Sequence, residues 1–199
     1  MITPIKRSLA EGGSIAFPTD TFYGLGVDPA NAEAVEKIFT IKERPADKPI
    51  LVLIDDREQL KDWAAKVPEL AVKAMDAFWP GPLTLLFPAR DDIPKALTAG
   101  TGKIGIRLPD SAIARQLVRD LGHALTAPSA NKSETENPVN ADDVNQSIGS
   151  AIDWIIDAGP APGNAPSTVL DVTSTPPVIV REGAIARADI EAALGLSPA

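Results

Sequence analysis

The sequence has no cysteine and no long uninterrupted apolar run. Without cysteine, disulfide bonds and thiolate chemistry are excluded. No stretch reaches the roughly 20 consecutive apolar residues that a membrane-spanning helix needs, and the N-terminal residues lack the apolar run of a signal peptide. We therefore expect a cytoplasmic protein without membrane contact.

Basic residues and histidine are also scarce. The 19 Lys and Arg residues are outnumbered by 27 Asp and Glu residues, which gives a formal net charge of −8. Because a generic nucleic-acid-binding protein has a basic surplus, any anion site must be local here. A serine-hydrolase triad would have to use His123, the only histidine, and the sequence has neither a Gly-x-Ser-x-Gly elbow nor a Walker loop.

The composition is that of one sizeable domain. The chain has 199 residues, of which 44% are apolar, and its 19 prolines are scattered. This favours a single domain over residues 1–199 with many short loops. Helical and strand patterns intermix without strict alternation, which predicts an α/β fold with a twisted mixed sheet and flanking helices rather than a pure doubly wound sheet.

Apolar periodicity and capping residues give the expected elements. Helices are predicted over residues 3–11, after Asn31, from Asp55 or Asp56 to about Ala65, over about 68–78, from Ser111 through Leu121, over 141–148 and from near Ala188. Strands are predicted over residues 14–17, 50–54, 83–87, 104–108, 123–127, 154–157, 168–172 and 178–181.

Residues 18–26, Pro-Thr-Asp-Thr-Phe-Tyr-Gly-Leu-Gly, are expected to form a loop after a strand. Two threonine hydroxyls, a carboxylate and a phenol lie within five positions. The two glycines allow the backbone to approach a ligand or to adopt a positive φ. A ligand-binding loop and an ordinary loop of turn residues fit this composition about equally well.

Residues 42–49, Lys-Glu-Arg-Pro-Ala-Asp-Lys-Pro, concentrate three cations. Pro45 disfavours helical geometry at Arg44, so the preceding helix should end there. Lys42, Arg44 and Lys48 can then fan out, and this mixture of ammonium and guanidinium groups suits polyphosphate oxygens. The acidic residues between them also fit a solvated charged turn.

Residues 126–133, Thr-Ala-Pro-Ser-Ala-Asn-Lys-Ser, place a hydroxyl and an amide among small residues after a predicted strand. Such a loop can contact phosphate or adenine edges, although turn formers alone would also explain it. Lys103, Arg107, Ser167 and Arg181 lie in or beside predicted strands. Charged strand residues usually face solvent, unless several of them meet on one concave face.

In order along the chain, these motifs resemble the YrdC/TsaC/Sua5 family. The matching segments are residues 18–26, 42–49, 78–88, 103–109, 127–133, 167–171 and 180–183. The Lys-x-Arg and Ser-x-Asn pairs, with a Trp-Pro-Gly-Pro-Leu-Thr run between them, are more specific than any single segment. The resemblance implies a YrdC-like fold around a deep concave pocket. The chain length predicts the short, single-domain type rather than the type with a linker and second domain.

The resemblance also implies an activity. Family members are threonylcarbamoyl-AMP synthases, nucleotidyltransferases that form threonylcarbamoyl-AMP and pyrophosphate from L-threonine, bicarbonate or CO2, and ATP, for the N6-threonylcarbamoyladenosine modification of tRNA. Mg2+ is expected with ATP, without a dedicated set of protein metal ligands, and Asp20 is a candidate outer-shell partner. tRNA or tRNA-modifying proteins are candidate partners. Two alternatives stay open: a YciO-type paralogue that binds RNA or nucleotide without this activity, and a carbamoyl-transfer domain of a larger enzyme.

Position by position, the resemblance implies the following site. The catalytic residues are Lys42 and Arg44. The threonine-binding residues are Thr21, Arg107, Ala127 and Ser167. The ATP-binding residues are Arg44, Lys48, Lys103, Ser129, Asn131, Asn137 and Arg181.

The chain departs from the family pattern at two places. Leu53 stands where some members carry a histidine that contacts threonine. Ser133 is followed by Glu134-Thr135-Glu136, where the family often has Ser-Gly. The second departure changes the shape and charge of the loop that reaches Asn137.

Overall fold

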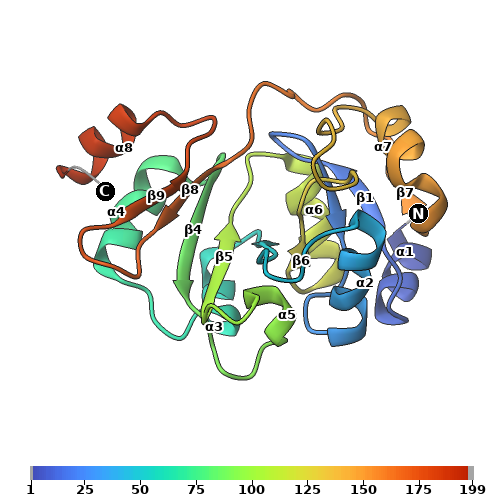
Figure 1. The fold of residues 1–199 in the computed structure, drawn as a ribbon, viewed down its shortest axis with the longest axis horizontal. Helices are drawn as coiled ribbons and strands as arrows, with labels where there is room; N and C mark the ends of the chain where they lie inside the picture. Colours follow the sequence, from blue (N-terminus) through green and yellow to red (C-terminus); the bar gives the residue numbers. More distant parts are fainter. Residues whose placement is uncertain (1, 197–199) are drawn as a thin grey trace.

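Two mixed β-sheets form the framework of the protein. The computed structural model describes residues 2–196, and in this part nine strands are flanked by helices (Figure 1). The predicted α/β class with mixed strand pairing is confirmed, although the strands form two sheets rather than one.

The smaller sheet has the order β2-β1-β7. The central strand β1 (Ile15–Pro18) is antiparallel to β2 (Tyr23–Gly26) and parallel to β7 (Trp154–Ile155). The turn between β1 and β2 carries the Thr-Asp-Thr sequence. The antiparallel pairing therefore holds these polar residues at one end of the sheet.

The larger sheet has the order β6-β3-β5-β4-β8-β9. Its strands are β3 (Val52–Leu53), β4 (Leu83–Pro88), β5 (Lys103–Arg107), β6 (Leu125–Thr126), β8 (Thr168–Asp171) and β9 (Val178–Arg181). The β3–β5 and β4–β8 pairs are parallel, and the other neighbours are antiparallel.

The chain that follows β6 joins the two sheets. The backbone N–H of Leu25 donates to the carbonyl of Pro128 at 2.7 Å, and that of Thr126 donates to the carbonyl of Val27 at 3.2 Å. The segment after β6 thus runs beside β2, and the two sheets meet along this line.

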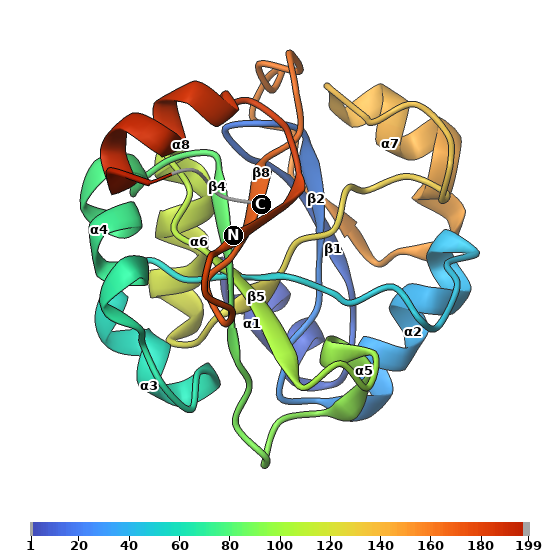
Figure 2. The same ribbon diagram turned by 60° about the vertical axis from the view of Figure 1, so that its left-hand side comes forward.

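Helices cover both ends of the sheets. They are α1 (Ile2–Ala10), α2 (Ala32–Lys42), α3 (Leu60–Trp63), α4 (Glu69–Phe78), α5 (Lys95–Thr98), α6 (Ala112–Leu121), α7 (Ala141–Ile148) and α8 (Arg187–Leu194), with short 3-10 turns at Arg57–Gln59 and Gly149–Ala151. In Figures 1 and 2, α4 and α8 lie at one end of the molecule and α2 and α7 at the other. None of the helices in the described residues has the length and apolar character to cross a bilayer.

Local sequence signals explain where two of the helices begin and one of them ends. The Asn31 side chain accepts from the N–H of Ala34, and the Ser111 side chain accepts from the N–H of Ala114, so both predicted N-caps are confirmed. Helix α2 ends at Lys42, two residues before Arg44, as the proline at position 45 requires. This end places the cationic segment beyond the helix.

A compact apolar cluster anchors the smaller sheet to the larger one. Phe17 of β1, Leu53 of β3 and Leu125 of β6 are fully buried and pack with residues of α1 and α6. Leu53, one of the two departures from the motif pattern, is therefore part of the core.

The sequence-based expectation of a loop over residues 18–26 is wrong for its second half. Residues 23–26 form β2, and the glycines there serve packing rather than a turn. A Cβ added at Gly26 would lie 2.8 Å from Leu125 Cδ2 and 2.9 Å from Phe17 Cε1. The sequence also gave no signal for α5, and the predicted strands over 50–54 and 123–127 pair over only two residues each.

We expect Gly26→Ala to lower the free energy of unfolding by about 1–3 kcal/mol, the usual range for overpacking a core. Gly105→Ala is the matched control. The side-chain atoms nearest to its added Cβ would lie at 3.3–3.4 Å, so its effect should be smaller. Urea unfolding measures both. Equal stability of Gly26→Ala and the wild type would contradict the close-packing role.

Candidate active site

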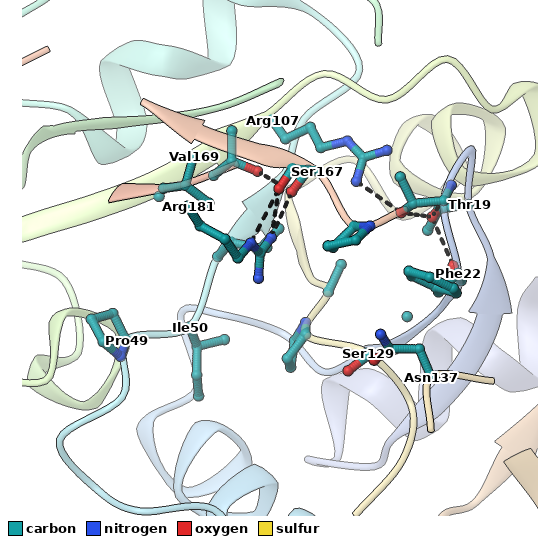
Figure 3. Close-up of a pocket in the computed structure, with 18 of the residues that line it drawn as sticks. Thr19, Phe22, Pro49, Ile50, Arg107, Ser129, Asn137, Ser167, Val169 and Arg181 are labelled. Atoms are coloured by element: carbon teal, nitrogen blue, oxygen red, sulfur yellow. Dashed lines mark hydrogen bonds between the residues drawn. The ribbon is translucent and has the colours of Figure 1, made fainter. Parts of the chain in front are cut away.

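A cavity of about 560 Å3 opens where the two sheets meet. This volume lies within the range of about 300–1,000 Å3 that is usual for small-molecule sites. Most of the residues predicted for the site line it: Thr21, Arg44, Lys48, Arg107, Ala127, Ser129, Asn137, Ser167 and Arg181. Figure 3 shows Arg107, Ser167 and Arg181 on one side of the cavity, with Ser129 and Asn137 across from them.

Arg107, at the end of β5, is held rigidly in one wall. Its side chain is 4% exposed and forms an ion pair with Asp20. Its Nη1 donates to Thr21 Oγ1 at 3.1 Å, and its Nε donates to the Gly81 carbonyl at 3.1 Å. The Thr19 and Thr21 hydroxyls are linked at 3.1 Å, so the β1–β2 turn and Arg107 form one network (Figure 3).

Ser167 and Arg181 meet because β8 and β9 are antiparallel neighbours. Arg181 Nη2 donates to the Ser167 carbonyl at 2.8 Å and to Ser167 Oγ at 3.1 Å. The buried hydroxyl of Thr84 lies 2.9 Å from Ser167 Oγ. Desolvation, and then repulsion from Arg107, lowers the pKa of Arg181 below its ordinary value.

Arg44 and Lys48 enter from the loop after α2. The Arg44 side chain binds the backbone at the far end of this loop. Its Nε donates to the Lys48 carbonyl at 3.2 Å, and its Nη2 donates to the Pro49 carbonyl at 2.9 Å. Desolvation, and then repulsion from Arg181, lowers the pKa of Arg44, while the charge of Asp47 acts in the opposite direction. Arg44 and Arg107 therefore both interact electrostatically with Arg181.

The charge balance of the cavity favours an anionic ligand. Within residues 2–196, neither Arg44 nor Arg181 forms an ion pair with a carboxylate, whereas Arg107 pairs with Asp20. Arg44 and Arg181, which repel each other, are stabilised when phosphate or carboxylate oxygens bind between them. A chain with a net charge of −8 thus carries a local cationic site.

Lys42 lies beneath the cavity rather than in its lining. Its side chain is almost fully buried, and its Nζ donates to the carbonyls of Ser129 and Asn131. The Lys42 carbonyl accepts from the N–H of Ser133 at 2.7 Å. Lys42 therefore holds the end of α2 against the loop after β6, and desolvation followed by repulsion from Arg44 lowers its pKa to about 7.

Two other predicted nucleotide contacts have their polar groups engaged elsewhere. Lys103, at the start of β5, pairs with Asp171 at 2.6 Å near the protein surface. Asn131 is buried, and its amide donates to the Thr135 carbonyl at 2.9 Å. The nucleotide-binding roles of Lys103 and Asn131 stay predictions, as does the catalytic role of Lys42.

The sequence did not point to Thr84 as a site residue, and it pointed to Asp20 only as a candidate outer-shell partner of Mg2+. Thr84 lies in the Pro-Leu-Thr-Leu-Leu segment of β4, where strand alternation turns its side chain to the cavity. Asp20 lies between the two threonines of the β1–β2 turn and binds Arg107. The motif segments contained both signals, but only the structure reveals their partners.

The lowered pKa of Lys42 predicts a pH-dependent stability. Between about pH 7 and 10.5, the unfolded chain binds a proton at this lysine that the folded protein has lost, so the free energy of unfolding should rise with pH across this interval. Below about pH 7, Lys42 is protonated in both states, and burial of its charge destabilises the folded protein by the full amount. In Lys42→Met this part of the rise should vanish. Urea unfolding at about pH 7 and about pH 9.5 measures the slope, and equal slopes in both proteins would contradict the assignment.

Comparison with known proteins supports the motif reading. The model of the Sua5/YciO/YrdC family, described as "Telomere recombination", matches residues 7–183. The threonylcarbamoyl-AMP synthase of Bacillus subtilis is 42% identical over 188 residues, which cover 94% of this chain and 54% of that protein.

Two solved structures share the fold closely. Pyrococcus abyssi Sua5 complexed with L-threonine superposes with a TM-score of 0.95 at 38% identity, covering 99% of this chain and 58% of that one. E. coli YciO superposes with a TM-score of 0.85 at 27% identity, covering 95% of this chain and 92% of that one. The chain spans about half the length of the first curated relatives that it matches, 54% and 55%. From this family match and these relatives, the chain belongs to the Sua5/YciO/YrdC family.

Proposed function

We propose that this chain is a threonylcarbamoyl-AMP synthase that converts L-threonine, bicarbonate or CO2, and ATP to threonylcarbamoyl-AMP and pyrophosphate. One observation carries the proposal: Arg44, Arg107 and Arg181 converge on one cavity in a fold that superposes on a threonine-complexed Sua5. The names of the curated relatives support the same reaction. A YciO-type binding role has less support, because the similarity to YciO is lower in both sequence and structure.

The Arg107 wall is the proposed threonine end. Arg107 has five N–H donors, and the three bonds that fix its orientation leave others for a substrate carboxylate. The hydroxyls of Thr21 and Ser167 line the cavity beside it, together with Ala127. These groups suit the carboxylate and hydroxyl of threonine.

The rest of the cavity is the proposed ATP end, and Arg181 lies where the two ends meet because it donates to Ser167. Arg44, Lys48 and Arg181 would contact phosphate oxygens, and Ser129 and Asn137 would hold the nucleotide. Lys42 would act through the loop that it supports, by fixing the backbone at Ser129. In this arrangement the cavity-lining residues would contact the nucleotide directly, whereas Lys42 would only position the loop.

The reaction needs no enzyme nucleophile. The threonine amine would combine with CO2 to give N-carboxythreonine. One oxygen of the new carboxylate would then attack the α-phosphorus of ATP, while the bond from the α-phosphorus to the bridging oxygen breaks and pyrophosphate leaves. Catalysis would come from orientation and from neutralisation of phosphate charge by preorganised cations. A site of arginines, a lysine, hydroxyls and amides fits this chemistry.

We expect the nucleotide to bind with Mg2+, which would neutralise phosphate charge. Residues 2–196 hold no group of three or more His, Asp or Glu side chains that could bind a metal ion. The ligands of a magnesium ion would then come mainly from phosphates and water. Asp20 Oδ2, buried and without a hydrogen-bond partner in the described residues, is one available carboxylate oxygen. The product would then serve tRNA modification in the cytoplasm, with tRNA or tRNA-modifying proteins as partners.

The first test is the reaction itself. The purified protein should release pyrophosphate from ATP only when threonine and bicarbonate are both present, and mass spectrometry should detect the threonylcarbamoyl adenylate. A relative with demonstrated synthase activity serves as the positive control. If the relative is active and this chain shows no threonine-dependent pyrophosphate release, the proposal is wrong.

The second test separates the cationic segment from a solvated turn. Arg44→Ala should lower kcat/KM for ATP by about 10- to 100-fold, because charge-assisted hydrogen bonds to phosphate are lost. Lys42→Ala should lower it by a similar factor, because the loop at Ser129 loses its support. Lys73→Ala, on the exposed surface of α4, is the matched control. Circular dichroism checks that the variants fold. Full activity of the Arg44 and Lys42 variants would show that this segment does not serve ATP.

A further inference from the structure

Reciprocal ion pairs link the two loops at the proposed ATP end. Lys48 Nζ lies 3.6 Å from Glu134 Oε1, and Lys132 pairs with Glu43 in the opposite sense. The acidic loop, defined as residues 133–136, thereby places a carboxylate on a lysine that lines the cavity.

Local backbone geometry does not explain a glutamate at this position. Glu134 has a φ of +67°, in the left-handed region where glycine is least strained. Glycine would relieve the strain but would remove the charge. The ion pair with Lys48 is thus the interaction that distinguishes Glu134 from the small residue that its backbone favours.

The Lys48–Glu134 ion pair is weak enough for a phosphate ligand to displace it. The Lys48 and Glu134 side chains are 46% and 81% exposed, and exposed ion pairs add little stability. A triphosphate at Arg44 and Lys48 carries several negative charges, so it would displace the single carboxylate from Lys48. While Glu134 stays nearby, its charge repels the bound phosphates.

We propose that Glu134 sets the affinity for polyphosphate ligands by competing with their phosphates for Lys48. The inference rests on the proposed ATP site and adds a residue to it. Without ligand, Lys48 binds Glu134; with ATP, Lys48 binds phosphate and Glu134 turns to solvent. The same competition favours release of pyrophosphate after the reaction.

The decisive variant is Glu134→Gln, which removes the charge and keeps the side-chain size. Its Kd for ATP and for pyrophosphate, measured by calorimetry without threonine at low salt, should fall by about two- to fivefold, as expected for an exposed ion pair. The Kd for adenosine, which has no phosphate, should stay the same. Raising the salt concentration should reduce the difference.

Three further variants isolate the cause. Glu136→Gln removes an equal exposed charge that pairs with no cation in the described part of the chain, so its effect should be smaller. Glu134→Gly should match Glu134→Gln in affinity and exceed it in stability, because strain is relieved as well. In a Lys48→Gln background, Glu134→Gln should no longer change the Kd for ATP.

Two results would overturn the proposal. One is an equal effect of Glu134→Gln and Glu136→Gln on the Kd for ATP, and the other is an undiminished effect of Glu134→Gln in the Lys48→Gln background. These outcomes are independent of the synthase assay. If the protein makes the adenylate but Glu134→Gln does not change its Kd for ATP, only this inference is wrong. If Glu134→Gln lowers the Kd for ATP as expected but the protein makes no adenylate, only the proposed reaction is wrong.

Discussion

The buried amino group of Lys42 is the constraint on which the rest of the site depends. A buried charge or polar group is costly unless it is hydrogen-bonded, and the carbonyls of Ser129 and Asn131 meet that need. In doing so they join the end of α2 to the loop after β6. Arg44 and Lys48 then stand on one side of the join and Ser129 and Asn137 on the other, around one cavity.

The two ends of the cavity have different electrostatics. At one end, Arg107 is neutralised by Asp20 and fixed by the β1–β2 turn, so it is preorganised for a single carboxylate. At the other, Arg44 and Arg181 form no ion pair with a carboxylate in the residues described, and their mutual repulsion favours a ligand with several negative charges. One amino-acid substrate and one polyphosphate substrate match this division.

Local signals in the sequence predicted the fold class, the caps at Asn31 and Ser111 and the end of α2, because each depends on neighbouring residues. They did not predict β2, because a glycine in a strand and a glycine in a turn cannot be told apart from neighbouring residues. The close packing of Gly26 against Leu125 and Phe17 is visible only in the structure. The burial of Lys42 was equally hidden, because its partner carbonyl lies 87 residues away. The family motifs contain most of the residues that line the cavity. Contacts between residues far apart in the sequence decide which of the cations face the cavity.

The two ends also differ in how the sheet supports them. Arg107 stands on β5, which has paired strands on both sides, whereas Arg181 stands on β9, the last strand in the order, whose pairing with β8 shifts register at Val169 and Leu170. Edge strands open locally at lower free energy than central ones. The cavity therefore joins a wall on a central strand to a wall on an edge strand, so the geometry around Arg107 is held more firmly than that around Arg181.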